Sequence, residues 1–113
     1  MDECIFCKII NGSIPSEFIY EDEKVVAFKD INPQAPVHLL IIPKEHIESI
    51  DDIDENNSHL VGYVFEIASK LAKEMGLDKG YRIVTNCKEH GGQSVNHIHF
   101  HLLGGRQLLW PAG

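Results

Sequence analysis

The sequence predicts one α+β domain, with a five-stranded antiparallel sheet, one long helix and a short N-terminal helix. Three observations support this. The chain has 113 residues, which is enough for one domain and too few for two. Only one long segment has apolar residues at three- and four-residue steps, and the other apolar runs are short. The connections between those runs are short as well, which favours hairpins and antiparallel pairing.

The N-terminal region predicts a helix and then a hairpin. Residues 4–10 can form a short helix that Asn11-Gly12 ends. Residues 18–21 and 24–30 are short runs rich in β-branched and aromatic residues, joined by a polar connection. This pattern is typical of two strands of a hairpin.

A buried strand and the long helix follow. Residues 37–42 are an apolar run that stops at a proline, consistent with a buried strand. The helix can begin at Asn57 or Ser58, either of which can cap it, and end near Gly76. Two further strands are predicted at residues 81–86 and 96–103, separated by a Gly-Gly loop.

Composition narrows the class of protein. The chain has 10 basic and 17 acidic residues, a net charge of -7 with neutral histidines. An acidic surface repels phosphate backbones and anionic lipids, so nucleic acid and membranes are not expected partners. No run approaches the roughly 20 apolar residues of a membrane-spanning helix. The N-terminus, Met1-Asp2-Glu3, is acidic where a secretory signal is basic. We therefore expect a cytoplasmic protein.

The last predicted strand carries three of the seven histidines. Side chains two apart face the same way in a strand, so His97, His99 and His101 form a row, roughly 6.5–7 Å apart along the chain. The intervening apolar residues face the helix. Three imidazoles are costly as core filler, because each needs hydrogen-bond partners when buried.

Two interpretations of this row remain open from the residues alone. Two alternating histidines can bind one zinc ion, or one histidine can act as a nucleophile with its neighbours as hydrogen-bond donors. The preceding Gly91-Gly92-Gln93-Ser94 segment lets backbone N–H groups approach an anion, which favours a phosphate ligand.

The segment from Gly91 to Leu103 resembles the signature of the histidine triad (HIT) superfamily, in which three histidines alternate with apolar residues. Further similarities are spread along the chain at residues 4–10, 14–15, 28–31, 33–36, 38, 42–44 and 46. The tail from Gly104 to Pro111 resembles the histidine triad nucleotide-binding (HINT) branch. The resemblance covers essentially the whole chain and implies a single HIT domain over residues 1–113.

The resemblance implies a homodimeric purine-nucleoside phosphoramidase whose sheet continues across the dimer and whose chemistry needs no metal. His99 would attack the α-phosphorus to form a nucleotidyl-histidine, which water then hydrolyses. The carbonyl of His97 would accept a hydrogen bond from the far ring nitrogen of His99. His101 would donate to a phosphate oxygen, and His38 would support the row. Ser94 and His101 would assist the leaving amine.

The same resemblance implies contacts to a purine nucleotide. Asp30 would bind the ribose hydroxyls, Asn86 would lie near the phosphates, and Gly92, Gln93 and Ser94 would contribute loop contacts to them. The apolar slot for the base would comprise Phe6, Ile9, Ile14, Phe28, Ile31 and Leu40. From the residues alone, a surface turn is the preferred interpretation of Asp30 and the six apolar residues are simply core, while His38 fits a buried structural histidine equally well.

The cysteines add a metal hypothesis. Three cysteines do not make a disulfide framework, and a close pair in a reducing compartment indicates metal or redox chemistry. Some bacterial HIT proteins bind a structural zinc with such a pair and two histidines. The matching residues here are Cys4, Cys7, His46 and His97, a closed tetrahedral set. The alternatives are reduced, inert thiols or a redox pair.

Other functions also stay open. The chain could be a non-catalytic nucleotide-binding protein, a dinucleoside polyphosphate hydrolase or nucleotidyl transferase, or a zinc hydrolase. The resemblance implies that the tail around Trp110 reaches toward the partner's site. Cys87, His59 and His90 receive no role.

Overall fold

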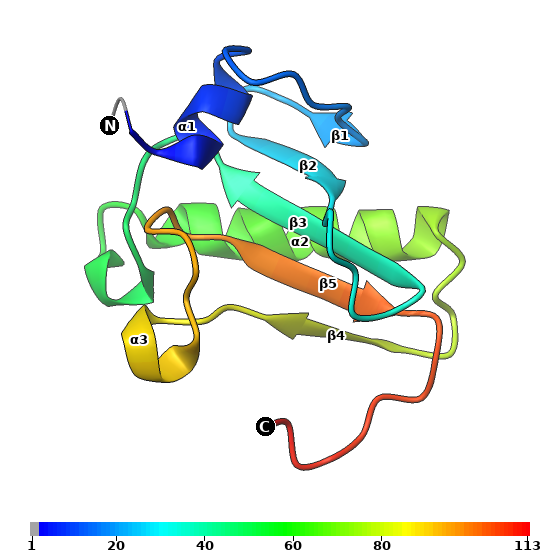
Figure 1. Ribbon diagram of the computed structural model, residues 1–113. Coiled ribbons are helices and arrows are strands. Elements are labelled where there is room, and N and C mark those ends of the chain that lie inside the picture. Colours follow the sequence, from blue (N-terminus) through cyan, green and yellow to red (C-terminus); the bar gives the residue numbers. More distant parts are fainter. Residues whose placement is uncertain (1–2) are drawn as a thin grey trace.

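The computed structural model describes residues 3–113 and contains a five-stranded antiparallel sheet in the order β1-β2-β3-β5-β4. The elements are α1 (Ile5–Ile10), β1 (Tyr20–Glu21), β2 (Val25–Lys29), β3 (Val37–Pro43), the 3₁₀ helix η1 (Ile50–Asp52), α2 (Ser58–Glu74), β4 (Tyr81–Val84), α3 (Lys88–Gly91) and β5 (Phe100–Gly104). This confirms the predicted sheet, long helix and short N-terminal helix (Figure 1). Met1 and Asp2, part of the acidic N-terminus, lie outside the described residues.

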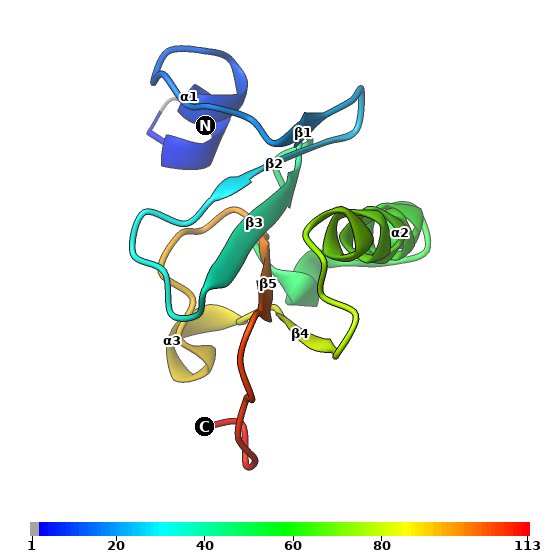
Figure 2. The same cartoon turned by 90° about the vertical axis from the view of Figure 1, so that its right-hand side faces the viewer.

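The long helix α2 covers one face of the sheet, and α1 lies on the opposite side (Figure 2). Under α2, Leu39 and Ile41 of β3 pack in the same core cluster as Ile98, Phe100 and Leu102. A second apolar cluster forms on the other face around Phe6. The two faces of β5 therefore separate as the alternating sequence predicts, and the histidines share their face with α1. Among residues 3–113, no helix is both long and apolar enough to cross a membrane.

Helix α1 depends on its surroundings, because six residues are too few for a stable isolated helix. Cys4 caps it, and its sulfur accepts a hydrogen bond from the backbone N–H of Cys7 at 3.3 Å. Phe6 is its buried residue. The cap, this aromatic ring and the packing of Ile9 and Ile10 against the same cluster hold α1 over the sheet.

The hairpin of β1 and β2 is tied to α2 through Asp22. Its carboxylate accepts hydrogen bonds from the hydroxyls of Tyr20 and Tyr63 and from the backbone N–H groups of Lys24 and Val25. Burial alone would raise the pKa of Asp22, but these donors together hold it well below its usual range. Because Tyr63 belongs to α2, the carboxylate links the hairpin to the long helix.

The structure differs from the sequence-based prediction around the histidines. The strand predicted over residues 96–103 begins only at Phe100, and the strand predicted over residues 81–86 ends at Val84. The backbone N–H of Ile98 donates to the carbonyl of Ile47 at 2.6 Å, so this segment bonds outside the ladder.

Two short helices were also missed, η1 and α3. They occupy segments read from the sequence as connections, where a single turn leaves almost no periodic signal. Gly92 ends α3 with a left-handed φ of 82°, a conformation that favours glycine.

Candidate active site and metal site

Four histidines gather on the face of the sheet that carries α1. His38 comes from β3 and His101 from β5, and these two strands are paired neighbours. The ring centroids of His99 and His101 are 5.2 Å apart, and those of His38 and His101 are 5.1 Å apart. His38, His97 and His99 are buried, whereas His101 is half-buried. The predicted row exists, although only His101 of the three triad histidines lies within a strand.

The ring of His99 is held by the backbone. Its Nδ1 lies 2.7 Å from the carbonyl oxygen of His97. A carbonyl can only accept, so Nδ1 carries the proton and Nε2 of a neutral ring keeps its lone pair. The hydroxyl of Thr85 donates to the carbonyl of His99 at 2.9 Å and fixes the backbone from the other side. Sequence reasoning missed Thr85, because a lone threonine just after β4 carries no signal of this contact.

The electrostatics keep the row uncharged. Burial lowers the pKa of His99. Burial, with the neighbouring His99 and His38, lowers the pKa of His101 to about 4. No buried side-chain nitrogen or oxygen in residues 3–113 lacks a partner. Nε2 of His99 has no hydrogen-bond partner among the described residues and so keeps some contact with solvent, although the side chain as a whole is buried. The site therefore holds a neutral imidazole with an available lone pair.

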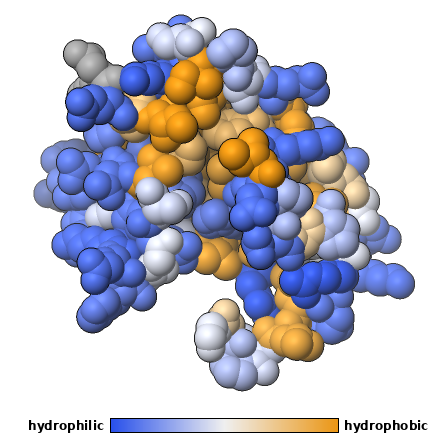
Figure 3. Space-filling view, in the orientation of Figure 1, coloured by the Kyte–Doolittle hydropathy of each residue, from blue (hydrophilic) through white to orange (hydrophobic). Residues whose placement is uncertain are grey.

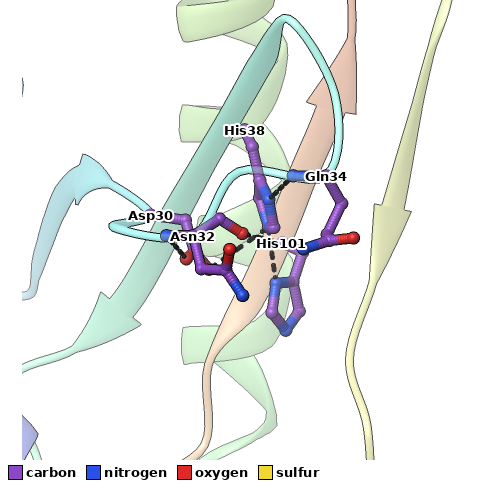
Figure 4. Close-up of polar contacts among 5 residues, drawn as sticks. All are labelled: Asp30, Asn32, Gln34, His38 and His101. Atoms are coloured by element: carbon purple, nitrogen blue, oxygen red, sulfur yellow. Dashed lines mark hydrogen bonds and ion pairs between the residues drawn. The ribbon is translucent and has the colours of Figure 1, made fainter.

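His38 sits at the centre of a small polar network (Figure 4). Its Nδ1 accepts a hydrogen bond from the backbone N–H of Gln34 at 3.0 Å. Its Nε2 lies 2.9 Å from Nδ1 of His101 and 3.4 Å from a carboxylate oxygen of Asp30. The other carboxylate oxygen of Asp30 accepts from the N–H of Asn32 at 2.8 Å. The structure thus brings Asp30 to the histidines.

An apolar wall stands beside the histidines. Phe6 meets the ring of His99 edge-on, with centroids 5.0 Å apart, and meets Phe28 at 6.0 Å. Phe28 and Leu40 are buried with it in one cluster, against which Ile9 packs. Figure 3 shows apolar residues gathered around α1 and the neighbouring strands on this face of the molecule.

Not every residue expected in the base slot belongs to that cluster. Ile14 is half-buried, while Ile31 is fully exposed at the surface. The pattern of apolar residues in the sequence does not predict that Ile31 is exposed.

The loop before the triad is braced from within. The side-chain N–H₂ of Gln93 donates to the carbonyls of Glu48 and Val95 at 2.6 and 2.9 Å, and its oxygen accepts from the N–H of Lys88 at 2.8 Å. Gln93 therefore uses its side chain to hold the loop rather than leaving it free for a ligand. Gly92 and Ser94 are exposed, and Asn86 is half-buried.

A second cluster joins α1 to the sheet through four possible metal ligands. Cys4, Cys7, His46 and His97 each offer one ligand atom, and all four atoms lie within 4.8 Å of one another. The sulfur of Cys7 lies 3.3 Å from Nδ1 of His46, and Nδ1 of His97 lies 3.5 Å from the sulfur of Cys4 and 3.6 Å from that of Cys7.

These distances fit a tetrahedral metal. Bonds of about 2.3 Å to sulfur and about 2.0 Å to nitrogen at tetrahedral angles place the two ligand atoms about 3.5 Å apart. His97 is also oriented for such a role, because its Nε2 donates to the carbonyl of Pro43 at 2.8 Å and leaves the lone pair of Nδ1 toward the sulfurs. The residues therefore could hold a metal ion at the junction of α1 and the sheet.

A separate hollow of about 640 Å³ lies between the loop after α2, the start of β4 and the segment that follows β5. None of the histidines lines it. The concentration of uncharged imidazoles, not this hollow, identifies the candidate active site.

Comparisons with known proteins agree with this geometry. A model of the HIT domain family matches residues 11–108. A 14 kDa zinc-binding protein of Zea mays is 53% identical over 111 residues, covering 96% of this chain and 87% of that protein. The structure of a HIT family hydrolase from Legionella pneumophila is 53% identical, with a TM-score of 0.96 and coverage of 98% of this chain and 100% of that one. A histidine triad nucleotide-binding protein from Candida albicans is 36% identical, with a TM-score of 0.81 and coverage of 98% and 85%.

Proposed function

The chain belongs to the HIT family, and from this premise we propose that it is a hydrolase of purine nucleoside phosphoramidates. The reaction would cleave the P–N bond at the α-phosphate of an AMP-type substrate. The observation that carries the proposal is the unpaired Nε2 of His99, whose lone pair is set by the hydrogen bond from Nδ1 to the carbonyl of His97. Hydrolase is also the description given to the Legionella relative.

The proposed chemistry has two displacements. Nε2 of His99 attacks the α-phosphorus and the P–N bond breaks, so the amine leaves with a proton from Ser94 or His101 and a nucleotidyl-histidine forms. Water then attacks phosphorus and returns a proton to whichever of Ser94 and His101 protonated the amine, the P–Nε2 bond breaks, and the nucleoside monophosphate leaves. The lowered pKa of His99 favours the neutral ring that such an attack requires. Donors around the phosphoryl oxygens would stabilise the charge that the transition state spreads over them.

The nucleotide would lie along the same face. Asp30 would accept from the ribose hydroxyls, and the cluster around Phe6, Phe28 and Leu40 would line the base with Ile9, Ile14 and Ile31. Asn86, Gly92, Gln93 and Ser94 would lie near the phosphates. Since the side chain of Gln93 is occupied within the loop, its part would be to hold the loop in place.

We propose zinc as the ion at Cys4, Cys7, His46 and His97. Two thiolates and two imidazoles form a closed set typical of structural zinc, and the maize relative is described as zinc-binding. When bound, zinc would supply a cross-link between α1 and the sheet. His97 would then position His99 through its carbonyl, and the catalytic steps would belong to the other histidines and Ser94.

The remaining parts of the proposal concern the assembly. One domain over residues 1–113 would form a homodimer in the cytoplasm. Its sheet would continue across the two-fold axis. Leu109 and Trp110 of the C-terminal tail are exposed, which supports a surface for the partner subunit at the tail.

The experiment that tests the function is trapping of the intermediate. The protein is mixed with an adenosine phosphoramidate and its intact mass is measured at short times. We expect a nucleotidyl adduct and turnover with the wild type and with His59→Ala, an exposed histidine outside the site, but neither with His99→Ala. Equal turnover by His99→Ala would refute the mechanism, whereas nucleotide binding without turnover by the wild type would favour a non-catalytic protein. Faster cleavage of a dinucleoside polyphosphate would identify the neighbouring class of hydrolase.

A further inference from the structure

The three groups around His38 are close enough to suggest a second metal site, but the backbone argues against one. The ligand atoms of Asp30, His38 and His101 lie within 4.8 Å of one another. A metal at Nε2 of His38 would require its lone pair there and the proton of the neutral ring on Nδ1. Nδ1, however, accepts from the N–H of Gln34 at 3.0 Å. A backbone N–H can only donate, so this nitrogen holds the lone pair.

The same contact determines where the protons lie. With a lone pair on Nδ1, a neutral His38 carries its proton on Nε2, which faces the carboxylate of Asp30 at 3.4 Å and Nδ1 of His101 at 2.9 Å. Both of these partners can accept. His101 therefore receives a hydrogen bond at Nδ1, and its neutral ring carries its proton on Nε2. Figure 4 shows this far nitrogen of His101 turned away from His38.

We propose that the backbone N–H of Gln34 fixes the tautomer of His101 through the ring of His38, so that His101 presents a protonated Nε2 to the phosphoryl group. The proposal rests on the proposed function for the identity of that group. Gln34 is a positioning residue, because it acts through two rings and does not touch the substrate.

The arrangement gives neighbouring rings opposite tautomers. A carbonyl holds the proton of His99 on Nδ1 and frees Nε2 as nucleophile. An amide N–H, relayed by His38, holds the proton of His101 on Nε2 and makes it a donor. A lone pair and an N–H thus stand on rings whose centroids are 5.2 Å apart. This is the pairing that attack on phosphorus and stabilisation of its oxygens require.

The chain also holds the Gln34 amide in place. The guanidinium of Arg106 donates to the carbonyl of Gln34 at 3.0 Å, and the Gln34 side chain donates to the carbonyl of Asn32 at the same distance. Arg106 follows β5 directly, two residues beyond its last residue, Gly104. The loop that supplies the amide is therefore fastened to the strand that carries His101.

The preference of His38 for a proton on Nε2 can be given a lower bound. The opposite tautomer of His38 would place its Nδ1–H against the Gln34 N–H and leave two partly buried donors without acceptors. That cost disfavours it by at least about tenfold. We therefore expect the minor tautomer of His38 and of His101 below about one-tenth of the molecules in the wild type.

The first test uses the wild-type protein labelled with ¹⁵N in its histidines. Long-range ¹H–¹⁵N spectra report which ring nitrogen carries the proton, and loss of signals in His38→Gln, His99→Ala and His101→Gln assigns them. We expect protons on Nε2 of His38 and His101 and on Nδ1 of His99 at neutral pH. A proton on Nδ1 of either His38 or His101 would overturn the proposal.

The second test removes the donor itself. Gln34→Pro lacks the N–H, whereas Gln34→Ala keeps it and loses only the side chain. We expect the minor tautomers of His38 and His101 to rise measurably in Gln34→Pro, though to less than half, because the carboxylate of Asp30 still favours a proton on Nε2 of His38. The value of kcat should fall by less than about twofold, in proportion to the molecules that hold the wrong proton. KM should stay within about twofold and Gln34→Ala should keep the wild-type tautomers. Wild-type tautomers in a folded Gln34→Pro would refute the role of the amide.

The two proposals fail separately. If the wild type shows the expected protons but forms no nucleotidyl adduct, the tautomer assignment stands and the phosphoramidase function fails. If the adduct forms while His101 carries its proton on Nδ1, the function stands and the role of Gln34 fails.

Discussion

Replacing Phe6 tests whether α1 is fastened to the histidine face. Phe6 is the buried residue of a six-residue helix, and its ring meets Phe28, His97 and His99 edge-on at centroid distances of 6.0, 6.0 and 5.0 Å. Phe6→Ala removes these contacts and leaves a cavity under α1. Helix propensity cannot compensate, because alanine already favours helix and a six-residue helix has little stability of its own.

The magnitude follows from the burial. Truncating a buried phenylalanine costs about 3–5 kcal/mol, and the position of α1 at the edge of the fold lets the cavity partly collapse. We therefore expect a loss of about 3 kcal/mol in the free energy of unfolding and a melting temperature lower by about 10 °C. Phe65→Ala is the matched control, since Phe65 is 47% exposed and contacts Phe100 at 6.1 Å. It should cost only about 1 kcal/mol.

Urea unfolding followed by circular dichroism measures both variants. The formation rate of the nucleotidyl adduct reports the catalytic consequence. We expect Phe6→Ala to slow adduct formation, because the wall that orients His99 is lost, and Phe65→Ala to leave it unchanged. Equal losses of stability in the two variants would mean that α1 does not rest on the histidine face in solution, and the reasoning would fail.

Three further predictions concern the metal, the triad and the hairpin. Native mass spectrometry should find one zinc per chain in the wild type and in Cys87→Ser but none in Cys7→Ser; retention of zinc by Cys7→Ser would exclude the proposed ligand set. The pKa of His101 is lowered to about 4 from an ordinary 6.5, so between these values the unfolded chain binds more protons and stability falls as pH drops. Relative to His101→Gln, the wild type should lose up to about 3 kcal/mol of unfolding free energy between pH 7 and pH 4, and parallel curves would contradict this. Asp22 has a pKa below its usual range. Its contribution to the free energy of unfolding is therefore present above about pH 4 and is lost as the pH falls through the pKa of Asp22 in the folded protein. Asp22→Asn should therefore cost about 2 kcal/mol at pH 7 in urea unfolding, and the difference from the wild type should shrink in acid; a difference independent of pH would show that the charge is not responsible.

The number of strands, their antiparallel pairing and the contents of the two sheet faces could be predicted, because they follow from local patterns. Alternation separates His99 from Phe100, and the three- and four-residue steps identify α2. The ends of the strands near the site could not be predicted, because hydrogen bonds to distant residues decide them. The bond from Ile98 to the carbonyl of Ile47 delays β5 until Phe100.

The roles of single polar residues were harder to predict. The family resemblance implies loop contacts from Gln93 to the phosphates, and only the structure shows that its side chain braces the loop through three backbone partners. Gln34 carries no signal at all, since its proposed role belongs to the backbone N–H. Every residue except proline offers the same backbone N–H, so only the tertiary structure reveals what that group contacts.

The sequence by itself determined which chemical groups are available: three alternating imidazoles, a Cys-x-x-Cys pair and a helix that buries the other face of the sheet. These depend on side-chain identity and on the period of the backbone. Tertiary structure alone decided that Cys7 lies 3.3 Å from His46 and that an amide N–H faces His38. Positions of protons and ligands are set by partners distant in sequence, and folding must bring those partners together before either can act.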